Sequence, residues 1–119
     1  MSDEFLRVAT QEINEELVGI LNILNSCSDD SEMEKNSAKI EMHMHKIKGL
    51  APMMGKENVG NLAKSLDSIL KKIVSGKKLD GFLECLKNSI PQMSMAMEKT
   101  HDLSSIQKEV SDLSLKILD

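Results

Sequence analysis

The sequence IEMHMHKIKGLAPMMG, residues 40–55, decides the fold because it combines a helical pattern with a defined end. Its apolar residues recur at intervals of 4, 3, 4 and 3 positions, the spacing of one helix face, and they are Ile40, Met44, Ile47, Ala51 and Met54. Gly55 supplies a natural C-terminal stop, and Pro52 is expected to kink the last turn. The stretch therefore predicts a helix over about residues 31–54 that ends at a turn.

The same periodicity predicts four further helices around this one. They cover about residues 3–25, 57–75, 80–99 and 103–118, and no stretch alternates as a strand does. Because short connections make successive helices antiparallel neighbours, we expect an all-α fold in a single domain over residues 1–119. It should be an antiparallel up-down-up-down four-helix bundle over about residues 3–100 plus a fifth C-terminal helix. The narrow apolar stripe of the fifth helix is typical of packing on one neighbouring helix.

The composition agrees with a helical core. The 119 residues contain no Trp or Tyr, two Phe and nine Met, so Leu, Ile, Val, Ala and Met must fill the interior. These residues favour helices over sheets. We expect the clustered methionines to fill gaps in the core rather than to bind metal, and they are Met42, Met44, Met53, Met54, Met93, Met95 and Met97.

Charge and cysteine content exclude several classes of protein. The net charge of -4 argues against a nucleic-acid-binding protein, because the phosphate backbone favours a basic surface. No apolar run approaches the roughly 18 residues of a membrane span, so no direct membrane insertion is expected. Cys27 and Cys85 are isolated, the N-terminus lacks a secretory signal, and we expect a cytoplasmic protein with both cysteines buried.

The two histidines of residues 40–55 do not form a metal-binding pair. At about 100° per residue, His43 lies on the shoulder of the apolar stripe and His45 points away from it, so the rings leave the helix roughly 160° apart. They cannot converge on one ion as histidines spaced i, i+4 can. We expect a structural role for His43, a cap or surface role for His101, and an exposed His45.

Charged residues share the solvent face with His45. Glu41 precedes it by four residues and Lys48 follows it by three, so both lie within one turn. Gly49 is costly inside a helix and is expected to leave room for the backbone of another protein. The helical hairpin then predicts what lies opposite: a turn near Lys56 makes Asp67 level with His45, and makes Lys64 level with Lys48.

A carboxylate beside an exposed imidazole suits phosphoryl transfer. One ring nitrogen must offer a lone pair while the other keeps its proton, and a carboxylate that accepts the second proton's hydrogen bond fixes this tautomer. Lys48 can hold phosphoryl oxygens by charge. From the residues alone, Asp67 could equally form an ordinary ion pair with Lys64 at i-3 or Lys71 at i+4.

At these residues the chain resembles the histidine phosphotransfer (Hpt) family. HKIKGLA, residues 45–51, followed by Gly55, looks like the H-x-x-K-G-x-A-x-x-x-G signature of Hpt domains. LAKSLDSIL, residues 62–70, is similar to the third helix of the Hpt domain at the N-terminus of CheA-type chemotaxis kinases. The resemblance extends over about residues 3–99, and the fifth helix suits the CheA type.

The resemblance implies a role for each matching residue. His45 would receive a phosphoryl group on Nε2 from ATP through a separate kinase domain, and would pass it to an aspartate of a CheY-like receiver. Lys48 and Lys64 would lie on the phosphate side, and Gly49 would be the small residue at the docking surface. Asp67 stands where the CheA type usually has glutamate, so its bond to the imidazole Nδ1 would be direct or bridged by water. Leu50 and Pro52 replace residues that are more often small, which would alter the docking surface or only the helix geometry.

The expected function is therefore that of a phosphorelay domain in two-component or chemotaxis signal transduction. The domain itself would bind no cofactor or metal and would catalyse nothing alone, while ATP and Mg would be used by the partner kinase domain. We expect an isolated monomer, and the end directly after an amphipathic helix suggests a fragment of a longer kinase. The alternatives are a helical adaptor without phosphorylation and a metal-binding bundle.

Overall fold

The computed structural model describes residues 1–117, and within this range the chain is helical without strands. The all-α prediction is confirmed. The elements are α1 (Asp3–Asn25), α2 (Asp30–Lys35), α3 (Ser37–Leu50), the 3-10 turn η1 (Pro52–Met54), α4 (Glu57–Val74), α5 (Phe82–Glu98), α6 (Ser104–Ser114) and the 3-10 turn η2 (Leu115–Ile117). None of the described helices is long and apolar enough to cross a membrane.

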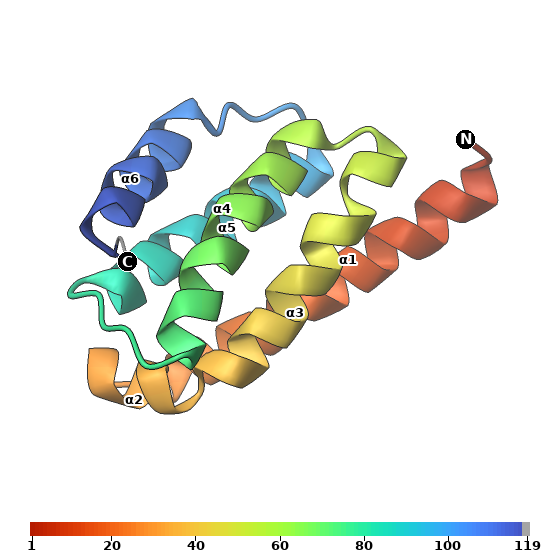
Figure 1. Cartoon of the computed structure of the whole chain (residues 1–119). Helices are drawn as coiled ribbons and strands as arrows, with labels where there is room; N and C mark the ends of the chain where they lie inside the picture. Colours follow the sequence, from red (N-terminus) through yellow and green to blue (C-terminus); the bar gives the residue numbers. More distant parts are fainter. Residues whose placement is uncertain (118–119) are drawn as a thin grey trace.

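The helices pack around a shared apolar core to which residues of α1 to α6 contribute. Figure 1 shows how these helices are arranged. Helix α1 packs against α3 and α5, α3 packs most extensively against α4, and α4 also contacts α5. Each helix contributes the periodic stripe expected from its sequence, and the largest fully buried side chains include Ile13, Ile20, Leu24, Met33, Ile40, Met44, Ile47, Leu62, Leu66, Ile69, Leu70 and Phe82. The fold therefore depends on apolar burial shared by helices that lie far apart in the sequence.

The single helix predicted over residues 31–54 is wrong in detail, because the structure divides it into α2, α3 and η1. At the first break, the Asn36 side chain donates a 2.9 Å hydrogen bond to the carbonyl of Glu32, an arrangement that competes with helical backbone bonding. At the second, Pro52 opens a 3-10 turn instead of kinking a continuous helix. The predicted stop at Gly55 is confirmed, since this glycine has φ 81°, where a side chain would be strained.

The C-terminal segment packs differently from the prediction. Helix α6 contacts both α4 and α5, whereas the narrow stripe predicted a single neighbour. The stripe is nevertheless buried at Leu103, Ile106 and Val110, and η2 buries Ile117. A narrow stripe can pack against two helices at once, because its ridge of side chains fits into the groove between them. Residue 118, the last of the predicted helix, lies outside the described residues.

The methionine prediction holds only in part. Met44, Met54, Met93 and Met97 are buried as expected, but Met42, Met53 and Met95 are exposed, with 61%, 63% and 37% of their surface accessible. The exposed three lie one or two positions from a buried one, where the helical period turns a side chain outward. Both cysteines are buried and free, as predicted. Burial raises the pKa of the Cys85 thiol to about 11, so this thiol is not ionised near neutral pH.

A long-range cap ties α2 to α5. The two carboxylate oxygens of Asp30 accept hydrogen bonds from the backbone N–H groups of Gly81 and Leu83, each 2.8 Å long. Gly81 precedes α5 and has no side chain of its own to cap the helix. Asp30 therefore supplies, from 51 and 53 residues away, the acceptors that a helix start requires.

We expect Asp30→Ala to lower the free energy of unfolding by about 1 kcal/mol, because it leaves these N–H groups without their acceptor. Urea unfolding monitored by circular dichroism measures the loss. Asp80→Ala is the matched control, since Asp80 carries the same charge next to α5 but is exposed. Equal losses in the two variants would show that general charge near α5, and not the cap, is responsible.

Candidate phosphoryl-transfer site

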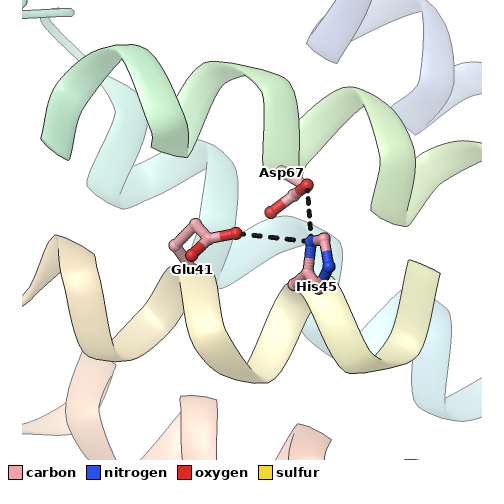
Figure 2. A group of neighbouring side chains, drawn as sticks. All are labelled: Glu41, His45 and Asp67. Carbon is pink, nitrogen blue, oxygen red and sulfur yellow. Dashed lines mark hydrogen bonds and ion pairs between the residues drawn. The ribbon is translucent and has the colours of Figure 1, made fainter. Parts of the chain in front are cut away.

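The packing of α3 against α4 brings His45 next to Asp67, as the hairpin register predicted. The imidazole Nδ1 of His45 lies 3.4 Å from Oδ2 of Asp67, a long but direct contact. The His45 side chain is 56% exposed, whereas that of Asp67 is 1% exposed. Figure 2 shows that the other ring nitrogen lies on the side of the ring away from the carboxylates. The imidazole ring thus contacts a buried carboxylate through Nδ1, while more than half of the side chain remains exposed.

Asp67 is held mainly by two lysines. Its Oδ2 accepts a 3.0 Å hydrogen bond from Nζ of Lys48 on α3 and lies 2.9 Å from Nζ of Lys71 on α4. Both distances are shorter than the 3.4 Å contact with the imidazole of His45. The ion pair with Lys71, considered from the sequence only as an alternative to a role at His45, therefore exists together with the histidine contact.

The electrostatics of the cluster keep Asp67 ionised. Burial by itself raises the pKa of this carboxyl, but hydrogen bonds with Glu41, Lys71, Lys48 and His45 outweigh burial and lower the pKa to about 2. Among the described residues, Oδ1 of Asp67 is buried without a donor in the standard hydrogen-bond geometry. Half of this carboxylate is therefore strongly bound, and the other half remains available.

Glu41 is a member of the cluster for which no role was predicted from the sequence. It lies one turn before His45 on α3, and its Oε2 is 3.6 Å from the His45 Nδ1. A hydrogen bond with Asp67, together with burial, raises the pKa of the Glu41 carboxyl. The i, i+4 spacing of Glu41 and His45 was the available signal, but only the position of Asp67 reveals that two carboxylates meet at one imidazole nitrogen.

The same three residues are the candidate metal ligands of the described chain. One ligand atom from each of Glu41, His45 and Asp67 lies within 4.8 Å of the others. The ammonium groups of Lys48 and Lys71, however, already neutralise Asp67 and would repel a cation bound there. The cluster has the donor types of a metal site, but its charge balance favours hydrogen bonding to the imidazole.

The other histidines have structural contacts. His43 is partly buried between α3 and α1, and its Nδ1 lies 2.7 Å from Oε1 of Glu16. A Cβ at Gly19 would lie 2.7 Å from the His43 ring, so the glycine makes room for this histidine. The Nε2 of His101 contacts the side chain of Gln92, consistent with the expected cap or surface role. The opposed directions of His43 and His45 are thus confirmed, and the two rings do not share a site.

Lys64 and Gly49 lie outside the carboxylate cluster. Lys64 is exposed on α4 beside the groove toward α6, and no described hydrogen bond or ion pair joins it to His45 or Asp67. Gly49 lies on α3, where an added Cβ would meet no atom within 4 Å. It lines a mainly apolar groove between α1 and α3 whose other residues include Phe5, Val8, Ala9, Leu50 and Met53. The protein's own packing does not require glycine at position 49.

Comparison with known proteins adds no further constraint on the function. Neither a protein-family model, nor a curated protein, nor a solved structure matches this chain.

The depressed pKa of Asp67 predicts a pH-dependent stability. Because the folded pKa of about 2 lies below the ordinary value of 3.8, ionised Asp67 contributes about 2 kcal/mol to stability at pH values above 3.8. That contribution is lost as the pH falls through about 2. The Glu41 carboxyl, whose pKa is raised, acts with the opposite sign, so both proteins to be compared carry Glu41→Gln.

Urea unfolding of Glu41→Gln and of Glu41→Gln/Asp67→Asn measures this effect. We expect the first protein to be the more stable one at pH 6, and the difference to shrink steadily below about pH 4, because the lysine and histidine contacts that lower the Asp67 pKa remain. A difference that does not vary with pH would contradict an ionised, buried Asp67.

Proposed function

We propose that this chain is a histidine phosphotransfer domain in which His45 accepts and donates a phosphoryl group. The observation that carries the proposal is an exposed imidazole whose Nδ1 faces a buried carboxylate, while its other nitrogen faces away from the cluster. A histidine that serves only as a surface residue does not require a carboxylate partner as buried as Asp67, whose side chain is 1% exposed. The resemblance of residues 45–51 and Gly55 to the Hpt signature supports the same conclusion.

The chemistry follows from the tautomer. With its proton on Nδ1 and directed at the carboxylates, the ring has a lone pair on Nε2. This lone pair attacks the γ-phosphorus of ATP held by a CheA-type kinase domain, a P–N bond forms, and the bond from phosphorus to the bridging oxygen breaks as ADP leaves. In the second step a carboxylate oxygen of a CheY-like receiver attacks phosphorus, the P–N bond breaks, and the electron pair returns to Nε2. Each step depends mainly on alignment and charge neutralisation.

The lysines suit the charge that the phosphoryl group brings. Lys48 is 30% exposed and lies one turn from His45, so its ammonium can leave Asp67 partly and bind a phosphoryl oxygen. Lys71 then continues to neutralise Asp67 from α4. Lys64, farther along the exposed side of α4, is proposed as a second cation on the phosphate side, reached only when substrate is present.

The architecture is also compatible with this family. We interpret α1, α3, α4 and α5 as the antiparallel four-helix bundle and α6 as the fifth helix of the CheA type. The proposed receiver-docking surface is the groove between α1 and α3 lined by Gly49, which lies one turn beyond His45. In this proposal the domain is a cytoplasmic monomer that binds no cofactor or metal, and the ATP and Mg belong to the kinase domain.

Phosphorylation of His45 tests the function directly. Incubation with a CheA-type kinase core and labelled ATP should give an acid-labile, base-stable label on the wild type and on His43→Gln, and none on His45→Gln. Thermal unfolding of each variant confirms that it is folded. Label that persists in folded His45→Gln would exclude His45 as the acceptor, and an unlabelled wild type would favour a helical adaptor.

Gly49 provides a test of the docking surface. Because its Cβ position is open, Gly49→Ala should raise the free energy of unfolding by about 0.5–1 kcal/mol through better helix propensity. Gly49→Gln should fold equally well but slow transfer from phosphorylated His45 to the receiver, since the side chain projects into the proposed docking groove.

The matched control for stability is Gly60→Ala on α4. There a Cβ would lie 2.7 Å from Cγ of the rigid Pro52 ring, so this variant should be destabilised. Transfer to the receiver is measured as the loss of label from His45. A transfer rate in Gly49→Gln equal to that of the wild type would contradict the docking proposal.

A further inference from the structure

We propose that Glu41 is a second positioning residue for His45, and that its carboxylate shares with Asp67 the hydrogen bond from the imidazole Nδ1–H. The inference rests on the proposed function, in which Nε2 is the reacting atom. It adds a residue that the Hpt-like signature of residues 45–55 does not contain, because Glu41 precedes that signature.

Asp67 alone is a weak partner for the imidazole ring of His45. Its Oδ2 is bound by ammonium groups at 2.9 and 3.0 Å, and these stronger, charge-assisted contacts draw the oxygen toward α4 and the end of α3. The imidazole contact of the same oxygen is 3.4 Å long, beyond the usual range of a strong N–H···O bond. A short aspartate side chain that already serves two lysines therefore leaves the Nδ1–H incompletely bonded.

Glu41 lies close to the same ring nitrogen of His45. Its Oε2 lies 3.6 Å from Nδ1 of His45, nearly as close as Asp67, and its side chain is only 19% exposed. Among the described residues no ion pair within 4.0 Å joins Glu41 to a lysine or arginine, whereas Oδ2 of Asp67 contacts two lysines. A small rotation of the longer glutamate side chain would shorten the contact into hydrogen-bonding range.

The two carboxyl groups also interact with each other. A hydrogen bond with Asp67 raises the pKa of Glu41, and Oδ1 of Asp67 is buried without a partner in standard geometry among the described residues. A protonated Glu41 can donate to Asp67, whereas an ionised Glu41 can accept from the imidazole. The groups facing Glu41 are His45 on its own helix and Asp67 and Lys71 on α4. Lys71 keeps two neighbouring carboxylates tolerable when both are ionised.

If Glu41 and Asp67 share the hydrogen bond from the Nδ1–H of His45, removing both should cost more than removing each in turn. Removing either carboxylate leaves the other able to hold the Nδ1–H, so each single variant loses part of the activity and the double variant loses more than the product of the two losses. We expect Glu41→Leu to slow phosphorylation of His45 by about fivefold, and Glu41→Leu/Asp67→Leu, which leaves no acceptor at either position, to slow it by more than about a hundredfold. Glu41→Gln keeps a neutral acceptor and should restore most of the rate. Glu34→Leu on α2 is the matched control for a glutamate-to-leucine change and should leave the rate unchanged.

A measurement on the ring separates positioning from effects on folding or docking. The nitrogen chemical shifts of His45, recorded by NMR on the neutral ring without kinase, give the populations of the Nδ1–H and Nε2–H tautomers. The Nδ1–H form should dominate in wild type and Glu41→Gln, decrease in Glu41→Leu, and decrease further in the double variant. Unchanged tautomer populations in Glu41→Leu would overturn the proposal.

The readouts also distinguish this inference from the proposed function. If the tautomers shift as expected but His45 of the wild type is never phosphorylated by any kinase core tested, the proposed function fails while the positioning of the ring by Glu41 stands. If His45 is phosphorylated and Glu41→Leu is as fast as Glu34→Leu, the function stands and the role of Glu41 is excluded. Wild-type tautomer populations that change on addition of EDTA would show a bound metal at the two carboxylates, which also overturns the proposal.

Discussion

The site depends on the pairing of the buried Asp67 carboxylate with two lysines. This carboxylate is an ionised group with 1% of its side chain exposed, in a molecule whose described interior is mostly apolar. Such a group is stable only when it is paired, and Lys48 from α3 and Lys71 from α4 provide the pairing. Because Lys48 comes from α3, its contact with Asp67 joins α3 to α4, whereas Lys71 neutralises the carboxylate from within α4. The imidazole of His45 is then placed within reach of a fixed charge.

Apolar packing and local backbone chemistry bring these helices together. The approach of α4 to the turn after α3 is close enough that only glycine fits at position 60, against the ring of Pro52. At the opposite end of the hairpin, Asp30 joins α2 to the start of α5. The cluster around His45 lies where α3 and α4 pack against each other, and its imidazole contact with Asp67 is 3.4 Å long. This arrangement supports the proposed chemistry, which needs an oriented ring with one free nitrogen.

Much of the architecture was predictable from residue spacing, because helix period is a local property. The five helical stretches, the outward direction of His45, the inward direction of His43 and the stop at Gly55 all follow from spacing. The breaks at Asn36 and Pro52 were missed, since the apolar stripe continues across both. At Asn36 a side chain replaces helical hydrogen bonding, and this outcome depends on competing bonds of similar energy. The packing of α6 against both α4 and α5 could not be predicted either, because the apolar stripe of α6 describes only one side of the contact.

The sequence by itself determined the helical class, the core-facing stripes and the level placement of His45 and Asp67, because each depends on counting residues along regular helices. Only the tertiary structure decided the partners within the site: that Lys71 rather than Lys64 binds Asp67, that Asp67 is fully buried, and that Glu41 faces it. The sequence could not predict these partners because long charged side chains have several possible acceptors at similar distances along the chain. Their choice is governed by burial and by the positions of charges on the neighbouring helix, which no pattern within one helix contains.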